Sequence, residues 1–382
     1  MIRFIFRRLF CAVLMLALTG QAGAVEPDRP LLVYTAITAT TPQIPLWAAL
    51  AELGPEKVAV EYWKTPDDLR GVILAGRGDI WVGHLEGFAQ AALRKAPVTL
   101  VAVTGWKKFR FIAPKDSPAT DMASLALELR EKGELLHAAP QGSPGLAVLE
   151  EIQKRGGPAF STASAQPRQL ILEMLRGTVR YALLPEPLVS VLLAKQPSLR
   201  VVAGLEEEFS RLYGGPGRLP LAGIAVNTRF AEENPEFVRR LARDMEVQAA
   251  RLAGDFDAAA RVLPQAVKEN LGMDIILASL AGDLILAAPA AEVKEEIAAF
   301  LRMALSGDAA ALAALPALMD GPFLFAANSH ANGFEGGKAR PLRRFTAAVD
   351  AARAFAAGYG LCPQPAPVSS LSAATRYGAG KP

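Results

Sequence analysis

Short apolar stretches alternate with amphipathic stretches between residues 31 and 103. The apolar stretches are typical of buried strands, and they are Leu31–Ile37, Val58–Trp63, Ile80–Gly83 and Val98–Val103. Between them, apolar residues recur at helical spacing around Ile44–Leu53, Pro66–Ala75 and Phe88–Leu93. Strands that alternate with helices of this length predict a mainly parallel sheet covered by helices on both faces.

A similar order of elements recurs further along the chain. Strand patterns at Leu135–Ala139 and Val179–Leu184 enclose helix patterns at Pro144–Lys154 and Arg168–Arg176. Identical residues also recur at an offset of 100 positions, and these pairs are Glu86 and Glu186, Leu93 and Leu193, Lys95 and Lys195, Pro97 and Pro197, and Val101 and Val201. The repeat is too long for a solenoid and predicts two α/β lobes of one design.

Two extended segments are expected to connect these lobes. Phe109–Ala113 leads out of the first lobe and Leu221–Asn227 leads back, so we expect a hinge near Phe111 and Ile224. Helix patterns after Pro235 and around Val293–Leu301 complete the first lobe, and the apolar stretch Ile275–Ala288 is expected to form helices packed on its core. The predicted domains are a signal peptide at 1–24, the first lobe at 25–113 and 221–362, an inserted second lobe at 114–220, and a flexible tail at 363–382.

The first 24 residues have the pattern of a secretory signal peptide. Met1–Arg8 carries three arginines, Leu9–Leu18 is an apolar run, and Ala22–Ala24 is a small-residue cleavage sequence. The run is too short to span a bilayer. We therefore expect cleavage after Ala24 and a periplasmic location.

Composition and net charge limit the kinds of partner that the protein can bind. The chain has 382 residues, 51% of them hydrophobic, which is enough for a sizeable core. Its formal charge is +3, and without Arg3, Arg7 and Arg8 of the signal peptide that charge is zero. Phosphate binding needs a basic surplus or stripe, so we expect no nucleic-acid partner. Cleavage leaves Cys362 alone, which excludes an intramolecular disulfide.

Four loops are candidates for a ligand site, because ligands of open α/β sheets bind beyond the carboxyl ends of the strands. The candidates in the first lobe are Thr38, Thr40, Thr41, Gln43, His84, Glu86 and Gly87, and those in the second lobe are Gln141, Gly142, Ser143 and Glu186. Hydroxyl and backbone N–H groups before a helix suit an anion or a polar oxygen. The threonines and Ser143 equally fit plain helix capping, with Pro144 at the first helical position.

The charged candidates leave the chemistry of the ligand open. His84 fits either a ligand contact or a structural hydrogen bond. Glu186 is held between two prolines, where it can meet a donor of the solute or a basic residue of the facing lobe. The four loops contain two carboxylates and neither Lys nor Arg, so a zwitterion or a neutral heterocycle fits as well as nitrate or a sulfonate. Trp47 and Trp81 fall at core spacing.

Three segments resemble the periplasmic solute-binding proteins of ABC importers, in particular the nitrate, sulfonate and taurine group that includes thiamine-pyrimidine binders. They are Gly78–Ile80, Leu184–Pro187 and Asn227–Glu236, and the resemblance covers about Leu31–Leu305. It implies the type II periplasmic binding protein fold with a ligand cleft between the lobes. It also implies a monomer that captures a small organic or oxyanion solute by lobe closure and delivers it to an ABC permease in the inner membrane. Residues 320–382 match nothing in the family pattern.

Enzymatic classes fit less well. His84, His137 and His330 are widely spaced and lack a zinc-binding pattern, and Gln141 stands two positions before Ser143, where a nucleophile elbow needs glycine. We therefore predict no metal, no cofactor and no catalytic residue. Two alternatives stay open: a cleft enzyme that uses Glu86 and Glu186 as acid and base, and a binding protein that signals to a membrane sensor.

Overall fold

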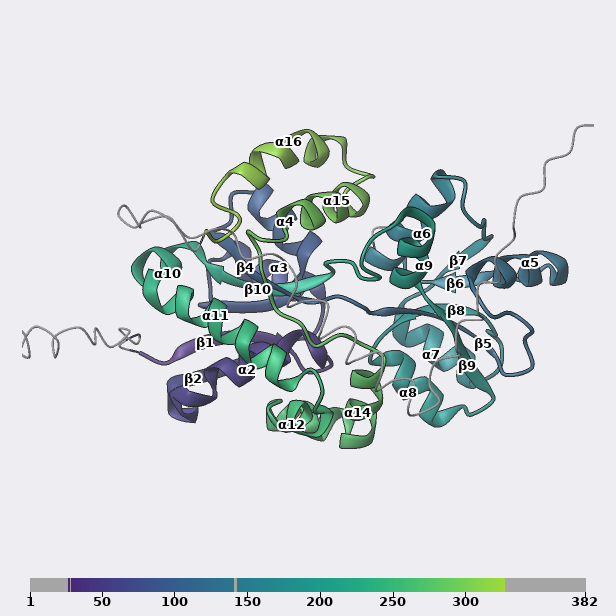
Figure 1. The fold of residues 1–382 in the computed structure, drawn as a ribbon, viewed down its shortest axis with the longest axis horizontal. Helices are drawn as coiled ribbons and strands as arrows, with labels where there is room; N and C mark the ends of the chain where they lie inside the picture. The colour runs from purple at the N-terminus through teal and green to yellow at the C-terminus, as the bar shows by residue number, and fades with distance from the viewer. Residues whose placement is uncertain (1–26, 28, 141–142, 327–382) are drawn as a thin grey trace, which may run out of the picture. The chain divides into compact units, whose positions relative to one another are not determined.

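The structure is a computed structural model, and it describes residue 27, residues 29–140 and residues 143–326 (Figure 1). The predicted signal peptide, the predicted tail and the site candidates Gln141 and Gly142 lie outside the described residues. Among the helices of the described part, none combines the length and the apolar character needed to cross a membrane.

Two sheets form the centre of the described part (Figure 1). The first has the order β11-β4-β10-β3-β1-β2, with β1 at Leu31–Ala36, β2 at Val58–Trp63, β3 at Ile80–His84, β4 at Val98–Gly105, β10 at Ala222–Asn227 and β11 at Ala288–Pro289. The second has the order β7-β6-β8-β5-β9, with β5 at Phe109–Pro114, β6 at Leu136–Ala138, β7 at Thr162–Ser164, β8 at Ala182–Pro185 and β9 at Leu199–Gly204.

The two sheets share one topology. In the first, β2, β1 and β3 are parallel neighbours, and the antiparallel β10 lies between β3 and β4. In the second, β7, β6 and β8 are parallel neighbours, and the antiparallel β5 lies between β8 and β9. The repeat at an offset of 100 positions thus corresponds to a repeated arrangement of strands.

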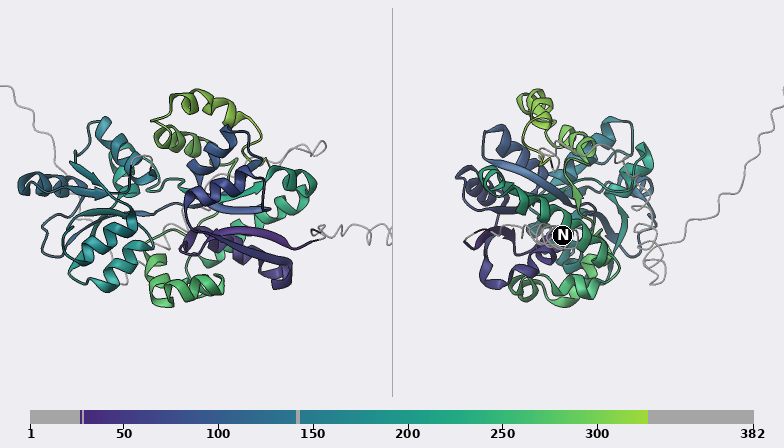
Figure 2. Two further views of the ribbon diagram at one scale, coloured as in Figure 1. Left: turned by 180° about the vertical axis from the view of Figure 1, so that it is seen from behind. Right: turned by 60° about the vertical axis from the view of Figure 1, so that its left-hand side comes forward.

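Helices cover both faces of each sheet, as the sequence predicts (Figure 2). Short 3-10 turns lie at Thr41–Gln43 (η1), Ala51–Leu53 (η2) and Pro55–Lys57 (η3). The α-helices are α2 Ile44–Leu50, α3 Pro66–Leu74, α4 Leu85–Leu93, α5 Met122–Lys132, α6 Pro144–Lys154, α7 Pro167–Leu175, α8 Leu188–Lys195, α9 Leu205–Tyr213, α10 Thr228–Glu233, α11 Pro235–Leu252, α12 Phe256–Arg261, α13 Gln265–Leu271, α14 Met273–Ala281, α15 Lys294–Ala304 and α16 Ala309–Asp320.

Three apolar clusters stabilise these layers. One fills the face of the first sheet under α2 and α11, and another fills the face of the second sheet under α7 and α8. The third continues from one sheet to the other through Trp106 and Phe109. Trp81 is fully buried and Trp47 nearly so, which confirms the predicted core positions of both rings.

The connections between the sheets differ from the expected hinge. Phe111 and Ile224 are each paired with strands on both sides, so they lie inside sheets that cannot bend freely at these positions. The chain passes between the sheets just before β5 and just before β10. There the backbone N–H of Leu219 donates to Trp106 O at 3.1 Å, and that of Leu221 donates to Gly105 O at 2.9 Å. The predicted domain boundaries stay a prediction, although β5, expected at the end of the first lobe, is paired within the second sheet.

The stretch Ile275–Ala288 also differs from the expectation that it is all helical. Helix α14 ends at Ala281, and Gly282–Ala287 continues without helix to β11. Helix α14 packs against α8, which flanks the second sheet, and α15 packs against α6 in the same way. These C-terminal elements therefore contact both lobes.

Candidate functional site

The loop after β1 is shaped by Gln43. The Gln43 Oε1 atom accepts hydrogen bonds from Thr35 Oγ1 at 2.8 Å and from Trp47 Nε1 at 2.7 Å. Its Nε2 atom donates to the carbonyl oxygens of Ala36 and Ala39. The amide is fully buried, and these four bonds hold the loop in place. Gln43 thus has a structural role, and its predicted contact with a ligand stays a prediction.

The threonines of this loop lie in different environments. Thr38 is half-buried, and Thr40 Oγ1 accepts a hydrogen bond from Ser279 Oγ of α14 at 3.1 Å. Thr41 is completely buried, and its hydroxyl has no hydrogen-bond partner among the described residues. Buried hydroxyls are normally paired, so Thr41 is a polar group that a bound molecule can satisfy.

The loop after β3 holds an imidazole beside a carboxylate. His84 Nδ1 lies 3.5 Å from Glu86 Oε1, and the side chains are 47% and 12% exposed. Burial lowers the pKa of His84, but the hydrogen bond and the charge of Glu86 outweigh it and leave this pKa above its ordinary value. Glu86 Oε2 is buried and accepts no hydrogen bond from the described residues. Gly87 follows in the first turn of α4.

Ser143 precedes α6 in the second lobe, where the sequence suggests a helix cap. Its backbone is at the N-cap position and Pro144 is the first helical residue, but the Ser143 side chain makes no capping bond. The Oγ atom is buried without a partner in the described part of the chain. The first turn of α6 contains no acidic residue, so the positive end of the helix is not neutralised there. Ser143 thus has an unused hydrogen-bonding group, and its contact with a ligand stays a prediction.

Glu186 follows β8 and is tied to both the helix after it and the connection between the sheets. Its Oε2 atom accepts from Ser190 N at 3.2 Å and from Ser190 Oγ at 2.8 Å. Its backbone N–H donates to Lys108 O at 2.8 Å. Burial raises the pKa of the Glu186 carboxyl, against the opposing effects of Ser190 and Arg110. The candidate carboxylates Glu86 and Glu186 therefore lie at corresponding places in the two lobes.

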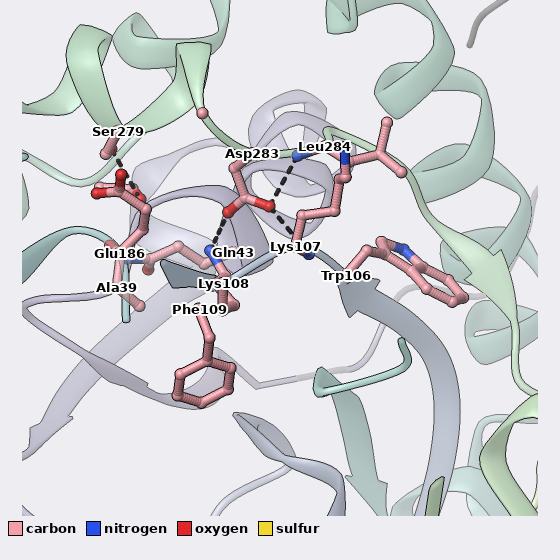
Figure 3. A network of polar contacts seen from close by, with 12 residues as sticks. Ala39, Gln43, Trp106, Lys107, Lys108, Phe109, Glu186, Ser279, Asp283 and Leu284 are labelled. Carbon is pink, nitrogen blue, oxygen red and sulfur yellow. Dashed lines mark hydrogen bonds and ion pairs between the residues drawn. The ribbon is translucent and has the colours of Figure 1, made fainter. Parts of the chain in front are cut away.

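A network of charged side chains that the sequence did not predict surrounds the connection between the sheets, and Figure 3 shows the part formed by Lys107, Lys108 and Asp283. We call it the connection network, and its members are Lys107, Lys108, Arg110, Glu206, Glu207 and Asp283. The one signal in the sequence is the run Lys107–Arg110, with three basic residues in four positions directly after an apolar strand. The acidic partners come from α9 and from the segment after α14.

Each cation of the network has a carboxylate partner. Lys107 Nζ lies 2.6 Å from Glu207 Oε1, and Lys108 Nζ donates to Asp283. The backbone N–H groups of Lys108 and Phe109 both donate to Glu206 Oε1, at 2.8 and 3.0 Å. The network thus fixes the first residues of the passage into β5.

Arg110 is the most buried cation of the network. Its Nη1 atom lies 3.5 Å from both Glu206 Oε2 and Glu207 Oε2, and Nη2 donates to Gly282 O. Its side chain is 7% exposed. Arg110 thereby joins the second sheet to the segment that follows α14.

Two grooves on the outside of the first lobe do not involve these residues. One of about 540 Å³ lies between α15 and α16, and one of about 560 Å³ is lined by α4, β4, α10 and α16. Neither is lined by a candidate site residue or by a buried unpaired side chain of the described residues. Among those residues, no three His, Cys, Asp or Glu side chains gather as metal ligands would. The loops at the strand ends therefore remain the candidate site.

Comparison by sequence finds no relatives, since no protein-family model and no curated protein matches the chain. Comparison by fold finds solved structures. An ABC transporter protein from Parabacteroides distasonis matches with a TM-score of 0.57 and 17% identity, over 75% of this chain and 95% of the other. The periplasmic aliphatic sulphonate binding protein SsuA from Escherichia coli matches with a TM-score of 0.57 and 14% identity, over 83% of this chain and 98% of the other.

The periplasmic nitrate-binding protein NrtA from Synechocystis PCC 6803 matches with a TM-score of 0.56 and 14% identity, over 77% of this chain and 86% of the other. At such identities the likeness concerns the fold and not the ligand. The structural neighbours are thus ABC-type periplasmic binding proteins, which agrees with the resemblance found in the sequence. The chain has their α/β fold, with two sheets flanked by helices.

Proposed function

We propose that this chain is the exported solute-binding component of an ABC importer. The observation that carries the proposal is a set of buried polar atoms beyond the strand ends of both lobes that have no partner among the described residues: Thr41 Oγ1, Glu86 Oε2 and Ser143 Oγ. Buried polar groups are almost always paired, so a solute that meets these atoms would complete their hydrogen bonds. Their position beyond the strand ends of this fold supports a binding site.

The proposed contacts are those that the sequence selects on the four loops. They are Thr38, Thr40, Thr41, Gln43, His84, Glu86 and Gly87 from the first lobe, and Gln141, Gly142, Ser143 and Glu186 from the second. A solute that contacts both lobes only in the closed state shifts the population toward that state by its difference in affinity. The paired segments before β5 and β10 are the proposed hinge.

The partner and the location follow from the same proposal. The signal sequence pattern supports export to the periplasm with cleavage after Ala24, and the fold supports delivery to a permease in the inner membrane. We propose that the protein acts as a monomer and performs no chemistry on its solute. The inserted second lobe would span residues 114–220.

A thermal-shift screen of residues 25–382 tests the binding function. The panel contains nitrate, bicarbonate, alkanesulfonates, taurine, amino acids, thiamine pyrimidines and flavins. A solute at a hundred times its Kd stabilises the folded state by about 2.7 kcal/mol, which raises Tm by a few degrees. A shift without turnover of the compound supports binding, whereas turnover favours the enzyme with Glu86 and Glu186 as acid and base.

Two variants test the site once a solute is found. Ser143→Trp fills the space before α6 and Glu186→Ala removes a carboxylate, so each should weaken binding by at least about tenfold. Ser161→Trp and Glu131→Ala change exposed residues of the same lobe and serve as matched controls. Unchanged affinity in folded Ser143 and Glu186 variants would show that the site lies elsewhere.

A further inference from the structure

The hydrogen-bonding groups left unpaired on the four loops identify the kind of solute, if the proposed binding function holds. We propose that the solute presents a nitrogen-centred cation, an ammonium, amidinium or guanidinium group, to Glu86 of the first lobe and Glu186 of the second. Sulfonate and nitrate, the ligands in the names of two structural neighbours, have the opposite charge.

The basic side chains near the loops already have partners. Lys107 and Lys108 are paired with Glu207 and Asp283, and Arg110 lies between Glu206 and Glu207. Asp283 is fully buried and Lys108 is 10% exposed, so an incoming anion would have to break a buried ion pair to reach this ammonium group. The cations of the connection network therefore do not form an anion site.

The carboxylates of the loops are less completely paired. Glu86 Oε2 is buried and has no donor among the described residues, while Oε1 faces His84 Nδ1 at 3.5 Å. Glu186 uses only Oε2 for its bonds to Ser190, and within the described residues its Oε1 receives no hydrogen bond. Apart from His84, whose Nδ1 faces Glu86, the charged atoms of the loops are therefore acceptors, and a donor with positive charge satisfies them.

Lys108 links the two carboxylates in space. Its carbonyl accepts the backbone N–H of Glu186. Shortly before it in the chain, Gly105 O accepts the N–H of Leu221, and Leu221 O accepts the N–H of Leu85, next to Glu86. Figure 3 shows Glu186 beside Lys108, to whose carbonyl its backbone is bonded. A solute between the lobes can thus meet a carboxylate on each side, as lobe closure requires.

The uncharged groups of the loops can bind either a hydrogen-bond donor or an acceptor of the solute. The hydroxyls of Thr41 and Ser143 both donate and accept hydrogen bonds, and neither has a partner in the described part of the protein. They can bind the neutral polar atoms of the same solute. The charge preference therefore depends on Glu86 and Glu186.

Small probes matched in size but not in charge test this proposal. Binding of propylammonium, acetamidinium and guanidinium to residues 25–382 is compared with that of 1-propanesulfonate, acetate and nitrate, by thermal shift and by calorimetry. We expect the cations to bind and the anions not to bind. Glu86→Gln and Glu186→Gln keep the size of each side chain and remove its charge, so each should weaken cation binding by about tenfold or more.

Glu52→Gln in the first lobe and Glu131→Gln in the second serve as controls, because both glutamates are exposed. These controls should leave binding unchanged, and circular dichroism should show that all four variants are folded. Binding of an anion that Glu186→Gln leaves intact or strengthens overturns the charge class but leaves the binding function standing. Failure of the cations, the anions and the wider solute panel alike overturns both proposals.

Discussion

The two lobes hold their candidate carboxylates in different ways, although their sheets share a strand order. In the first lobe Glu86 faces the partly exposed imidazole of His84. In the second, Glu186 is bound by Ser190 and lies near the buried Arg110. One scaffold thus places an acidic group after corresponding strands, while the residues that contact this group differ between the lobes.

The lobes also differ in how their loops are fixed. Gln43 makes four hydrogen bonds that hold the loop after β1 from within the first lobe. The Glu186 segment of the second lobe is instead tied to Lys108 of the connection and faces Gly282 of the segment after α14. The backbone of Glu186 is therefore held by the connection between the lobes, whereas the four bonds of Gln43 stay within the first lobe.

The largest effect is expected from breaking the connection network at Arg110. Arg110→Met leaves Glu206 and Glu207 with less charge compensation in a buried setting, so the free energy of unfolding should fall by about 3–5 kcal/mol. Urea unfolding measures this change. The matched control, Arg94→Met, alters an exposed arginine and should stay within about 0.5 kcal/mol of the wild type.

A double variant tests whether the stability lost in Arg110→Met comes from the uncompensated charge of the glutamates. In Arg110→Met with Glu206→Gln, one of the two carboxylates that lose this cation is also neutralised, so part of the lost stability should return. A double variant less stable than the sum of the two single changes would contradict this account of the network.

A smaller effect is expected from adding one methyl group to the corresponding helices of the two lobes. A Cβ atom at Gly145, in the first turn of α6, would lie 2.7 Å from the Phe109 ring, whereas one at Gly87, in the first turn of α4, would have no neighbour within 4 Å. Gly145→Ala should therefore lower the free energy of unfolding by about 1–3 kcal/mol, as overpacking does. Gly87→Ala should raise it by up to about 1 kcal/mol, because alanine favours the helix.

The denaturation midpoints of Gly145→Ala and Gly87→Ala, each compared with that of the wild type, measure these two effects. Equal effects of the same sign would mean that the close approach of α6 to the connection has no energetic consequence. The Gly87 variant also shows whether this position contacts the solute, since a methyl group there can alter affinity without altering stability.

Local patterns made much of the fold predictable. The strand Val58–Trp63 and the helix Pro144–Lys154 have the predicted bounds, because their apolar spacing and the proline at the helix start are properties of the segment itself. The helix around Ile275–Ala288 ends earlier than expected. Gly282 and Asp283 interrupt the helical pattern there, and Asp283 bonds to Lys108 instead.

The candidate site was less predictable, because its contacts join distant positions. Lys108 and Asp283 are 175 residues apart in the chain, and no spacing rule relates them. The role of Gln43 depends on Thr35 and Trp47 at once, which only the folded loop brings together. Ser143 shows that a local pattern can also mislead: its position before Pro144 fits a helix cap, yet its hydroxyl makes no capping bond.

The smallest effect is a pH dependence in which each lobe contributes one group. The pKa of Glu186 is raised by burial, and that of His84 is raised because Glu86 outweighs burial. In both cases the folded state binds the proton more tightly than the unfolded state, so stability falls as pH rises. For Glu186 the fall begins near the ordinary carboxyl pKa of 4.5, and for His84 near 6.5.

Two variants, Glu186→Gln and His84→Gln, separate the contributions of these groups to the pH dependence. The free energy of unfolding of each is measured from pH 4 to 8. Glu186→Gln should flatten the lower part of the profile, although Glu206, whose pKa burial also raises, keeps some slope there. His84→Gln should flatten only the upper part, and by less, because solvent screens a side chain that is 47% exposed. If stability instead rises with pH in the lower range and Glu186→Gln removes that rise, the Glu186 carboxyl is stabilised as an anion, and its neighbours rather than its burial determine its charge.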